Sequence, residues 1–204
     1  GGRSEPLGRC LEYSRFTSST SGVMPNSLLA PSITQRAEKI RLVCFDVDGT
    51  LTDGRLFFDE HGGELKAFHV HDGQGLRLLE DSGIAVALIT ARESQIVKKR
   101  GADLRLAHIY TGVANKLQVL QTLCQSLNIT LLQVAYMGDD FPDLACLQSA
   151  GLAACPKDAL AVIKQAVHWQ SDFDGGQGAA RQFCDLILQA QNLQQALIKR
   201  YSAP

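Results

Sequence analysis

The sequence predicts an α/β fold, in which a doubly wound parallel sheet lies between two layers of helices. From Arg41 onward, short apolar runs alternate with amphipathic helical patterns, and this order is typical of parallel sheets covered on both faces. The chain has 204 residues, of which 45% are apolar, enough for one sizeable core but crowded for two domains. We therefore expect a single three-layer domain over residues 39–204.

The predicted strands are apolar throughout, which indicates burial on both faces of the sheet. They are expected at Arg41–Phe45, Ile84–Ile89 and Val134–Met137, with shorter strands at His108–Tyr110 and Gly151–Cys155. Apolar residues at helical spacing between them predict amphipathic helices. These helices are expected at Gly73–Asp81, Glu93–Arg100, Asn115–Leu127, Phe141–Gln148, Asp158–Gln165 and Ala179–Lys199.

Residues 1–38 differ in composition from the rest of the chain. Residues 1–31 are rich in Ser, Gly and Pro, have no sustained periodicity and begin with Gly-Gly. Such a segment buries too little apolar surface to fold by itself. We interpret it as a disordered tail or a cloning remnant, with Met24 as a candidate natural start.

The overall charge and the cysteines exclude some classes of partner and site. A net charge of -1 supplies no global positive field for nucleic acid or an anionic membrane. The six cysteines form no C-x-x-C pair and are expected to be buried thiols of a reducing compartment. No apolar stretch has the roughly 20 residues that a membrane span needs. We expect a cytoplasmic protein.

Polar side chains follow three predicted strands at the points where these strands end. They are Asp46 and Asp48, Thr90 and Arg92, and Asp139 and Asp140, while Lys116 begins the helix after a fourth strand. Ligands of open α/β sheets bind beyond the carboxyl ends of the strands. These residues are therefore expected to converge on one site.

Several carboxylates at one edge of a sheet repel one another unless a cation neutralises them. Magnesium prefers oxygen ligands and usually binds one or two carboxylates together with substrate phosphate. No Cys/His cluster has the spacing of a zinc site. The sequence predicts a Mg²⁺ site formed by Asp46, Asp139 and a main-chain carbonyl near Asp48.

The segment Asp46–Thr50, Asp-Val-Asp-Gly-Thr, is followed in order by Thr90, Lys116 and Gly138–Asp140. This ordered set resembles the four motifs of haloacid dehalogenase-type phosphatases, which have a Rossmann-type fold. The resemblance implies that Asp46 is the nucleophile, that Asp48 is the general acid and base, and that Thr90 and Lys116 contact the phosphoryl group. It also implies that Asp140 and Asp143 orient ligands or waters, although Asp143 is equally consistent with a surface carboxylate.

Within that superfamily, the chain is similar to the capless 3-deoxy-D-manno-octulosonate 8-phosphate phosphatases from about Ile40 to Ala190. The similarity is carried by Leu51–Gly54, Gly63–Gly75 and Gly175–Arg181. Only about 20 residues separate Gly54 from Gly75, where larger relatives insert a cap domain. That length predicts a β-hairpin flap near residues 55–68, with strands at Arg55–Phe58 and Glu64–Phe68 and a turn at Asp59–Gly63.

The resemblance also implies a set of substrate-binding positions. They are Asp48, His69, Val70, His71, Asp72, Gly73, Arg77, Arg92, Arg100 and Lys116. A sugar acid that carries a carboxylate and a phosphate gives the cations among them a purpose. By themselves, Arg77 and Arg100 are more typical of solvated helix positions, and His69 and His71 are expected on an extended strand. The family usually has Asn and Arg at the two histidine positions, and Gly in place of Ala91.

The implied activity is removal of phosphate from 3-deoxy-D-manno-octulosonate 8-phosphate, a step toward outer lipopolysaccharide. Alternatives are a phosphatase for a nine-carbon keto-sugar acid phosphate, a phosphotransferase with the same residues, and a catalytically silent oligomerisation module. The apolar hairpin is too small to bury itself. With the resemblance, it predicts a homotetramer with active sites at subunit interfaces.

Overall fold

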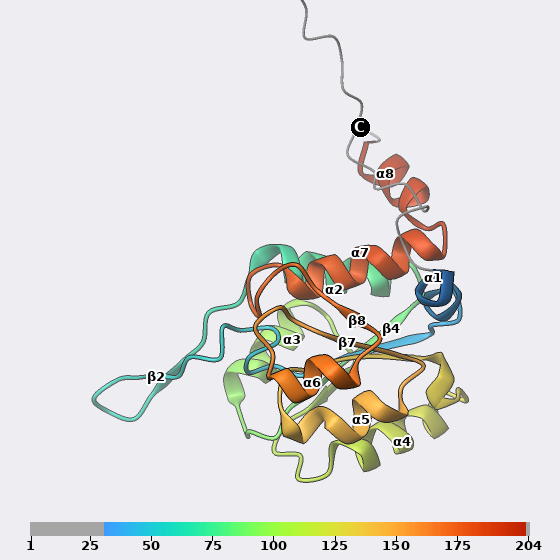
Figure 1. Ribbon diagram of the computed structural model, residues 1–204. Helices are drawn as coiled ribbons and strands as arrows, with labels where there is room; N and C mark the ends of the chain where they lie inside the picture. The colour runs from blue at the N-terminus through green and yellow to red at the C-terminus, as the bar shows by residue number, and fades with distance from the viewer. Residues whose placement is uncertain (1–30, 203–204) are drawn as a thin grey trace, which may run out of the picture.

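The computed structural model describes residues 31–202, which build one six-stranded parallel sheet with helices on both faces (Figure 1). The sheet order is β5-β4-β1-β6-β7-β8. Its strands are β1 Leu42–Phe45, β4 Ala85–Ile89, β5 His108–Tyr110, β6 Val134–Met137, β7 Leu152–Cys155 and β8 Trp169–Gln170. The predicted fold class is confirmed, and of these six strands only the two-residue β8 had no predicted counterpart.

Two hydrophobic clusters fill the spaces on either side of the sheet. One cluster contains Val43 and Phe45 of β1, and the other contains Leu42 and Cys44. Because successive side chains of a strand point to opposite faces, a strand buried on both sides must be apolar at every position. This is the pattern from which the strands were predicted.

Within the described part of the chain, seven helices pack against these faces. On one face lie α1 Pro31–Ala37, α2 Val70–Asp81, α3 Gln95–Asp103 and α7 Ala179–Ala190, and on the other lie α4 Lys116–Ser126, α5 Leu144–Ser149 and α6 Ala161–Ala166. The last helix, α8 Gln194–Ser202, extends away from the sheet (Figure 1). Among residues 31–202, no helix is long and apolar enough to cross a bilayer.

The order of the strands determines where a ligand can bind. The chain passes from β1 through β4 to β5 on one side, and then crosses over to β6 on the other side of β1. The N–H of Asp46 donates to the carbonyl of Met137 at 3.0 Å, so the residues that follow β1 and β6 are adjacent. Such a switch point is the usual ligand site of doubly wound sheets.

A β-hairpin projects from the body of the molecule (Figure 1). Its strands, β2 Phe57–Phe58 and β3 Glu64–Leu65, are shorter than predicted and pair antiparallel. The predicted turn at Asp59–Gly63 is present, because the Asp59 carboxylate accepts from the N–H groups of His61 and Gly63 at 2.9 and 2.7 Å.

The first described residues correct the predicted end of the tail. Helix α1 covers residues 31–37, and the side chains of Ile33 and Ala37 are buried against the first cluster. The boundary at residue 38 was therefore wrong, because this short helix gains its stability from packing. The remainder of the predicted tail, including Cys10 and Met24, lies outside the described residues.

Two helix predictions are also corrected. Helix α2 begins at Val70 instead of Gly73, which places His71 in its first turn and not on an extended strand. The single helix predicted at Ala179–Lys199 is divided into α7 and α8. The division falls at Asn192, whose φ of 58° is left-handed, a conformation that Asn adopts more readily than most residues.

The packing of α7 on the sheet gives a test of the core. Phe183 is fully buried, stacks on Trp169 with ring centroids 5.6 Å apart, and meets Phe45 edge-to-face at 6.3 Å. Phe183→Ala should lower the free energy of unfolding by about 3–5 kcal/mol, through lost apolar burial and the remaining cavity. Urea unfolding measures this change, with the exposed Leu132→Ala as a control expected within about 0.5 kcal/mol of wild type. A loss below about 1 kcal/mol for Phe183→Ala would contradict this account of the packing.

Candidate active site

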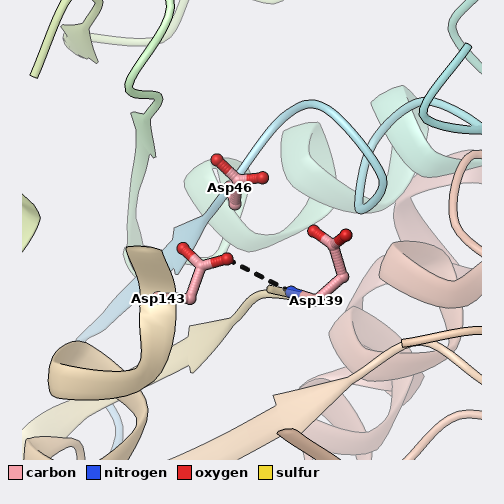
Figure 2. Close-up of side chains that lie close together, drawn as sticks. All are labelled: Asp46, Asp139 and Asp143. Atoms are coloured by element: carbon pink, nitrogen blue, oxygen red, sulfur yellow. Dashed lines mark hydrogen bonds between the residues drawn. The ribbon is translucent and has the colours of Figure 1, made fainter. Parts of the chain in front are cut away.

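Three carboxylates meet at the switch point of the sheet (Figure 2). Asp46 follows β1, Asp139 follows β6, and Asp143 ends the short 3₁₀ helix η3 Phe141–Asp143. One oxygen from each of them lies within 4.8 Å of the others. Asp46 and Asp143 are buried and Asp139 is partly buried, so water screens their mutual repulsion poorly.

The ammonium group of Lys116 lies between two of these carboxylates. It donates to Oδ1 of Asp46 at 2.5 Å and to Oδ1 of Asp143 at 2.7 Å. Lys116 is the first residue of α4, which Asn115 caps by accepting from the N–H of Gln118. Burial acts to lower the pKa of Lys116, but the two carboxylates outweigh it and the pKa is raised. The ammonium therefore stays charged.

Asp143 is held from four directions. Its Oδ1 accepts from Lys116 and from the hydroxyl of Tyr136 at 2.8 Å, and its Oδ2 accepts from the N–H groups of Asp139 and Asp140 at 3.2 and 3.4 Å. Figure 2 shows the bond to Asp139. The alternative of a surface carboxylate is wrong for this buried residue. With its acceptor sites occupied, Asp143 orients Lys116 and the segment that carries Asp139.

The cluster has more negative than positive charge. Burial and the charge of Asp143 raise the pKa of Asp46, and Lys116 only partly offsets them. Burial and Asp143 likewise raise the pKa of Asp139. An oxygen-only set of this kind fits a magnesium ion, with Asp46 and Asp139 as the ligands that keep free oxygens. The Asp48 carboxylate does not join this cluster among the described residues.

Glycine is required where the loop after β1 approaches Asp139. Gly49 has a φ of 93°, and a Cβ at this position would lie 2.2 Å from Oδ2 of Asp139. Any side chain at Gly49 would therefore displace the cluster.

The glycine-rich segment near the C-terminus, whose role the sequence left open, packs on this same loop. A Cβ on Gly175 would lie 1.9 Å from the carbonyl oxygen of Gly49, and the N–H of Gly176 donates to the carbonyl of Thr50 at 3.0 Å. The Arg181 side chain forms an ion pair with Asp185 at 2.9 Å and makes no hydrogen bond to this loop among the described residues. The segment thus supports the motif through its backbone.

Asp48 faces the hairpin and not the carboxylate cluster. Its Oδ1 contacts the ammonium group of Lys66, which lies 3.1 Å from Oε1 of Glu64. Arg92 also approaches Glu64, with Nη2 at 3.1 Å from Oε1. Neither Lys66 nor Glu64 was predicted to take part in the site. Their spacing of two residues on an extended segment is the signal that places them on one face.

Two of the predicted phosphate and substrate contacts lie close to this site. Thr90 is buried after β4, and its hydroxyl oxygen accepts from the N–H of Arg92 at 3.3 Å. The guanidinium of Arg92 is partly exposed beside Asp48. The Arg92 side chain is therefore accessible to an anionic ligand, and contact by Thr90 stays a prediction.

Other predicted substrate contacts have partners within the fold. Asp72 accepts from the N–H groups of Gly178 and Arg181 at 3.3 and 2.8 Å and so binds the start of α7. Arg77 bonds to Asp81 and to the carbonyl of Leu104 at 3.1 and 3.0 Å.

The remaining predicted contacts lie where the hairpin joins α2. Arg100 lies over the ring of Phe68 at 5.7 Å, and its guanidinium leaves no room for a Cβ on Gly73. His69 and His71 meet edge-to-face with centroids 5.2 Å apart, and Val70 between them is exposed. Substrate contact by these residues stays a prediction.

Known proteins share this chain's sequence over most of its length. A family model for haloacid dehalogenase-like hydrolases matches residues 105–182. The 3-deoxy-D-manno-octulosonate 8-phosphate phosphatase KdsC of Salmonella typhimurium is 40% identical over 163 residues, covering 80% of this chain and 87% of the relative. The chain belongs to the 3-deoxy-D-manno-octulosonate 8-phosphate phosphatase family. Family membership confirms the resemblance seen in the motifs.

Solved structures related to this phosphatase family have the same fold. A hypothetical protein from Xanthomonas campestris superposes with a TM-score of 0.86 at 48% identity, covering 91% of this chain and all of its own. The Moraxella catarrhalis phosphatase, described as a complex with magnesium ion, phosphate ion and KDO, has a TM-score of 0.81 at 40% identity. It covers 83% of this chain and 98% of its own.

The contacts of Lys116 predict a large loss of stability on its removal. Lys116→Met leaves the buried carboxylates of Asp46 and Asp143 without their cation, and removal of one partner of a buried pair typically costs about 3–5 kcal/mol. The free energy of unfolding should fall by about that amount in metal-free protein, as measured by urea unfolding. Lys98→Met, which removes a cation half-exposed beside Glu93, is the matched control and should change stability by less than about 1 kcal/mol. Equal effects of the two substitutions would show that Lys116 does not balance the cluster.

Proposed function

We propose that this protein is a magnesium-dependent phosphatase that hydrolyses 3-deoxy-D-manno-octulosonate 8-phosphate to the free sugar acid and phosphate. The observation that carries the proposal is the arrangement of Asp46, Lys116 and Asp139 at the switch point of the sheet. This arrangement occurs in a chain that is 40% identical to phosphatases of that specificity over 80% of its length. It joins a nucleophile, a phosphate-binding cation and a metal ligand in one site.

The donor set supports magnesium as the cofactor. The Moraxella catarrhalis relative is described with magnesium, and the Haemophilus influenzae relative with cobalt. In this chain, Asp46 and Asp139 would hold the ion, together with the predicted main-chain carbonyl of Asp48. When bound, magnesium neutralises phosphoryl oxygens and keeps the nucleophile ionised.

The first half of the reaction transfers the phosphoryl group to the protein. The Asp46 carboxylate attacks phosphorus in line with the leaving oxygen of the sugar, which forms an aspartyl-phosphate and breaks the ester bond. Asp48 donates a proton to the leaving oxygen. Lys116 and the hydroxyl of Thr90 bind the phosphoryl oxygens as charge develops on them.

The second half releases phosphate. Asp48, now ionised, takes a proton from a water molecule that attacks the phosphorus of the aspartyl-phosphate. The bond between phosphorus and Asp46 breaks, and inorganic phosphate leaves. Asp143 holds Lys116 and the chain around Asp139 in place during both halves.

For the sugar acid, Arg92 is the best-placed cation among the predicted contacts, because it is partly exposed and lies beside Asp48. His69, His71 and Arg100 surround the base of the hairpin and would form the rest of the pocket. Asp72 and Arg77 are held within the fold, so we propose that they shape this pocket from behind.

A phosphatase for a nine-carbon keto-sugar acid phosphate is the closest alternative, since the site chemistry is the same. The proposed product is used toward outer lipopolysaccharide, and we place the enzyme in the cytoplasm. The five cysteines among the described residues are all free and buried, in keeping with a reducing compartment.

Phosphate release from the two sugar-acid phosphates, with magnesium and with excess chelator, tests the proposal. We expect a higher kcat/KM on the eight-carbon substrate, no activity in chelator, and recovery on addition of magnesium. Asp46→Asn should lower kcat at least about 10³-fold, because the amide cannot attack phosphorus, while its circular dichroism stays that of wild type. Asp172→Asn, an exposed carboxylate away from the cluster, is the control. Substantial release by Asp46→Asn, or full activity in chelator, would refute the site.

We further propose that the protein is a homotetramer with hairpins packed between subunits. Phe57, Phe58 and Leu65 are respectively 48%, 61% and 64% exposed on the projecting hairpin, and such apolar clusters are typical of contact surfaces. A neighbour's hairpin would also shield the open site from bulk water.

Sedimentation of wild type at working concentration should give a tetramer. Phe58→Asp should shift the equilibrium to smaller species, because it places a charge in the buried contact, while Leu132→Asp, exposed elsewhere, should not. A monomeric wild type would disprove the assembly.

A further inference from the structure

Lys66 has a buried ammonium group although it lies on an exposed hairpin. Its side chain is 0% exposed, while its neighbours Leu65 and Ala67 face solvent. Residues two apart on an extended segment share a face, so Glu64 and Lys66 project together toward Asp48. A lysine is almost never fully buried unless it is paired, and Lys66 is paired with both carboxylates.

These residues form a closed chain of four charges with Arg92. Nη2 of Arg92 lies 3.1 Å from Oε1 of Glu64, and its Nε lies 3.9 Å from Oδ2 of Asp48. This network of four residues contains two cations and two carboxylates, so its net charge is zero when all four are ionised. Burial acts to raise the pKa of Glu64, but Lys66 and Arg92 outweigh it and the pKa is lowered. Glu64 therefore remains a counter-charge for Lys66.

The two oxygens of Asp48 have different surroundings. Oδ1 accepts from Lys66. Oδ2 is buried and has no hydrogen-bond partner among residues 31–202, since the 3.9 Å to Arg92 is too long for one. Buried polar atoms are nearly always bonded, so an exception needs an explanation. Oδ2 therefore has an unused hydrogen-bond capacity, which a group that reaches it on substrate binding would satisfy.

We infer that Lys66 is a positioning residue, which holds Oδ1 of Asp48 so that Oδ2 faces the leaving oxygen of the substrate. The inference rests on the proposed function and adds a residue to it. As the ester bond breaks, the proton on Oδ2 passes to the leaving oxygen, and the next proton returns to Oδ2 from the attacking water. Glu64 is the second partner of the Lys66 ammonium, so Lys66 is fixed beside Oδ1 from two sides.

A series of aryl phosphates that differ only in leaving-group acidity tests this role. A poor leaving group needs the proton from Asp48, whereas an acidic phenol leaves without it. In Lys66→Met, kcat/KM should fall about 10–100-fold for the least acidic phenol and less than about threefold for the most acidic. The plot of log kcat/KM against leaving-group pKa should therefore be steeper than for wild type. Lys66→Arg should restore much of the wild-type slope, because it keeps a cation beside Oδ1.

Lys98→Met is the matched control, because it removes a lysine from an ion pair far from Asp48 in the sequence and should leave the slope unchanged. Lys66→Gln, which keeps a donor without a charge, gives the measurement if Lys66→Met does not fold. A wild-type slope in a folded Lys66 variant would overturn the inference, and so would a uniform loss across the series. Failure of the proposed function would give a different result from failure of the Lys66 inference. In that case, wild type would release no phosphate from the sugar-acid phosphate or from the aryl phosphates in magnesium.

Discussion

The site depends on the electrostatic cost of gathering carboxylates at one poorly hydrated edge of the sheet. Asp46, Asp139 and Asp143 are brought together by the order of β1 and β6, and isolated buried charges are strongly unfavourable. Lys116 provides one compensating charge within the protein. The uncompensated remainder is the driving force for binding a cation, and through the cation a phosphate. The same repulsion that makes the cluster costly in the metal-free protein favours cation binding, and its oxygen ligands suit a hard ion such as magnesium.

Backbone packing holds the residues of this carboxylate cluster in position. Gly49 gives Asp139 its space, and Gly175 lets a distant segment lie against the carbonyl of Gly49. The contact of Gly175 with Gly49 is between backbone atoms alone, and both contacts limit how far the loop after Asp46 can move. The hairpin contributes from the other side, since Lys66 reaches Asp48. Asp46 and Asp48 are thus supported by different parts of the chain, with Lys116 beside the first and Lys66 beside the second.

Local patterns were sufficient to predict the sheet and the residues at its strand ends. The all-apolar strands and the Asp46–Thr50 motif can each be recognised from a few consecutive residues. Contacts between residues far apart in the sequence could not be predicted from such local patterns. The bond of Asp72 to the start of α7 joins residues more than a hundred positions apart, and the pairing of Lys66 with Asp48 depends on how the hairpin folds back. The burial of Asp143 was left open because a carboxylate in a first helical turn has the same sequence signature on a surface. The break between α7 and α8 at Asn192 was missed because the apolar periodicity continues beyond it.

The contact of the Gly175 segment with the loop after β1 has a consequence for how the protein is made. The two partners are separated by roughly 125 positions, and closing so long a loop is entropically slow. During synthesis, β1 leaves the ribosome long before β6 and the glycine segment exist. A nascent chain that ends before residue 134 contains Asp46 but lacks Asp139, Asp143 and the backbone that packs on Gly49. Phosphatase activity therefore requires synthesis through the Gly175 segment, and a chain that stops before residue 134 has apolar strands without their partners, a form prone to aggregation.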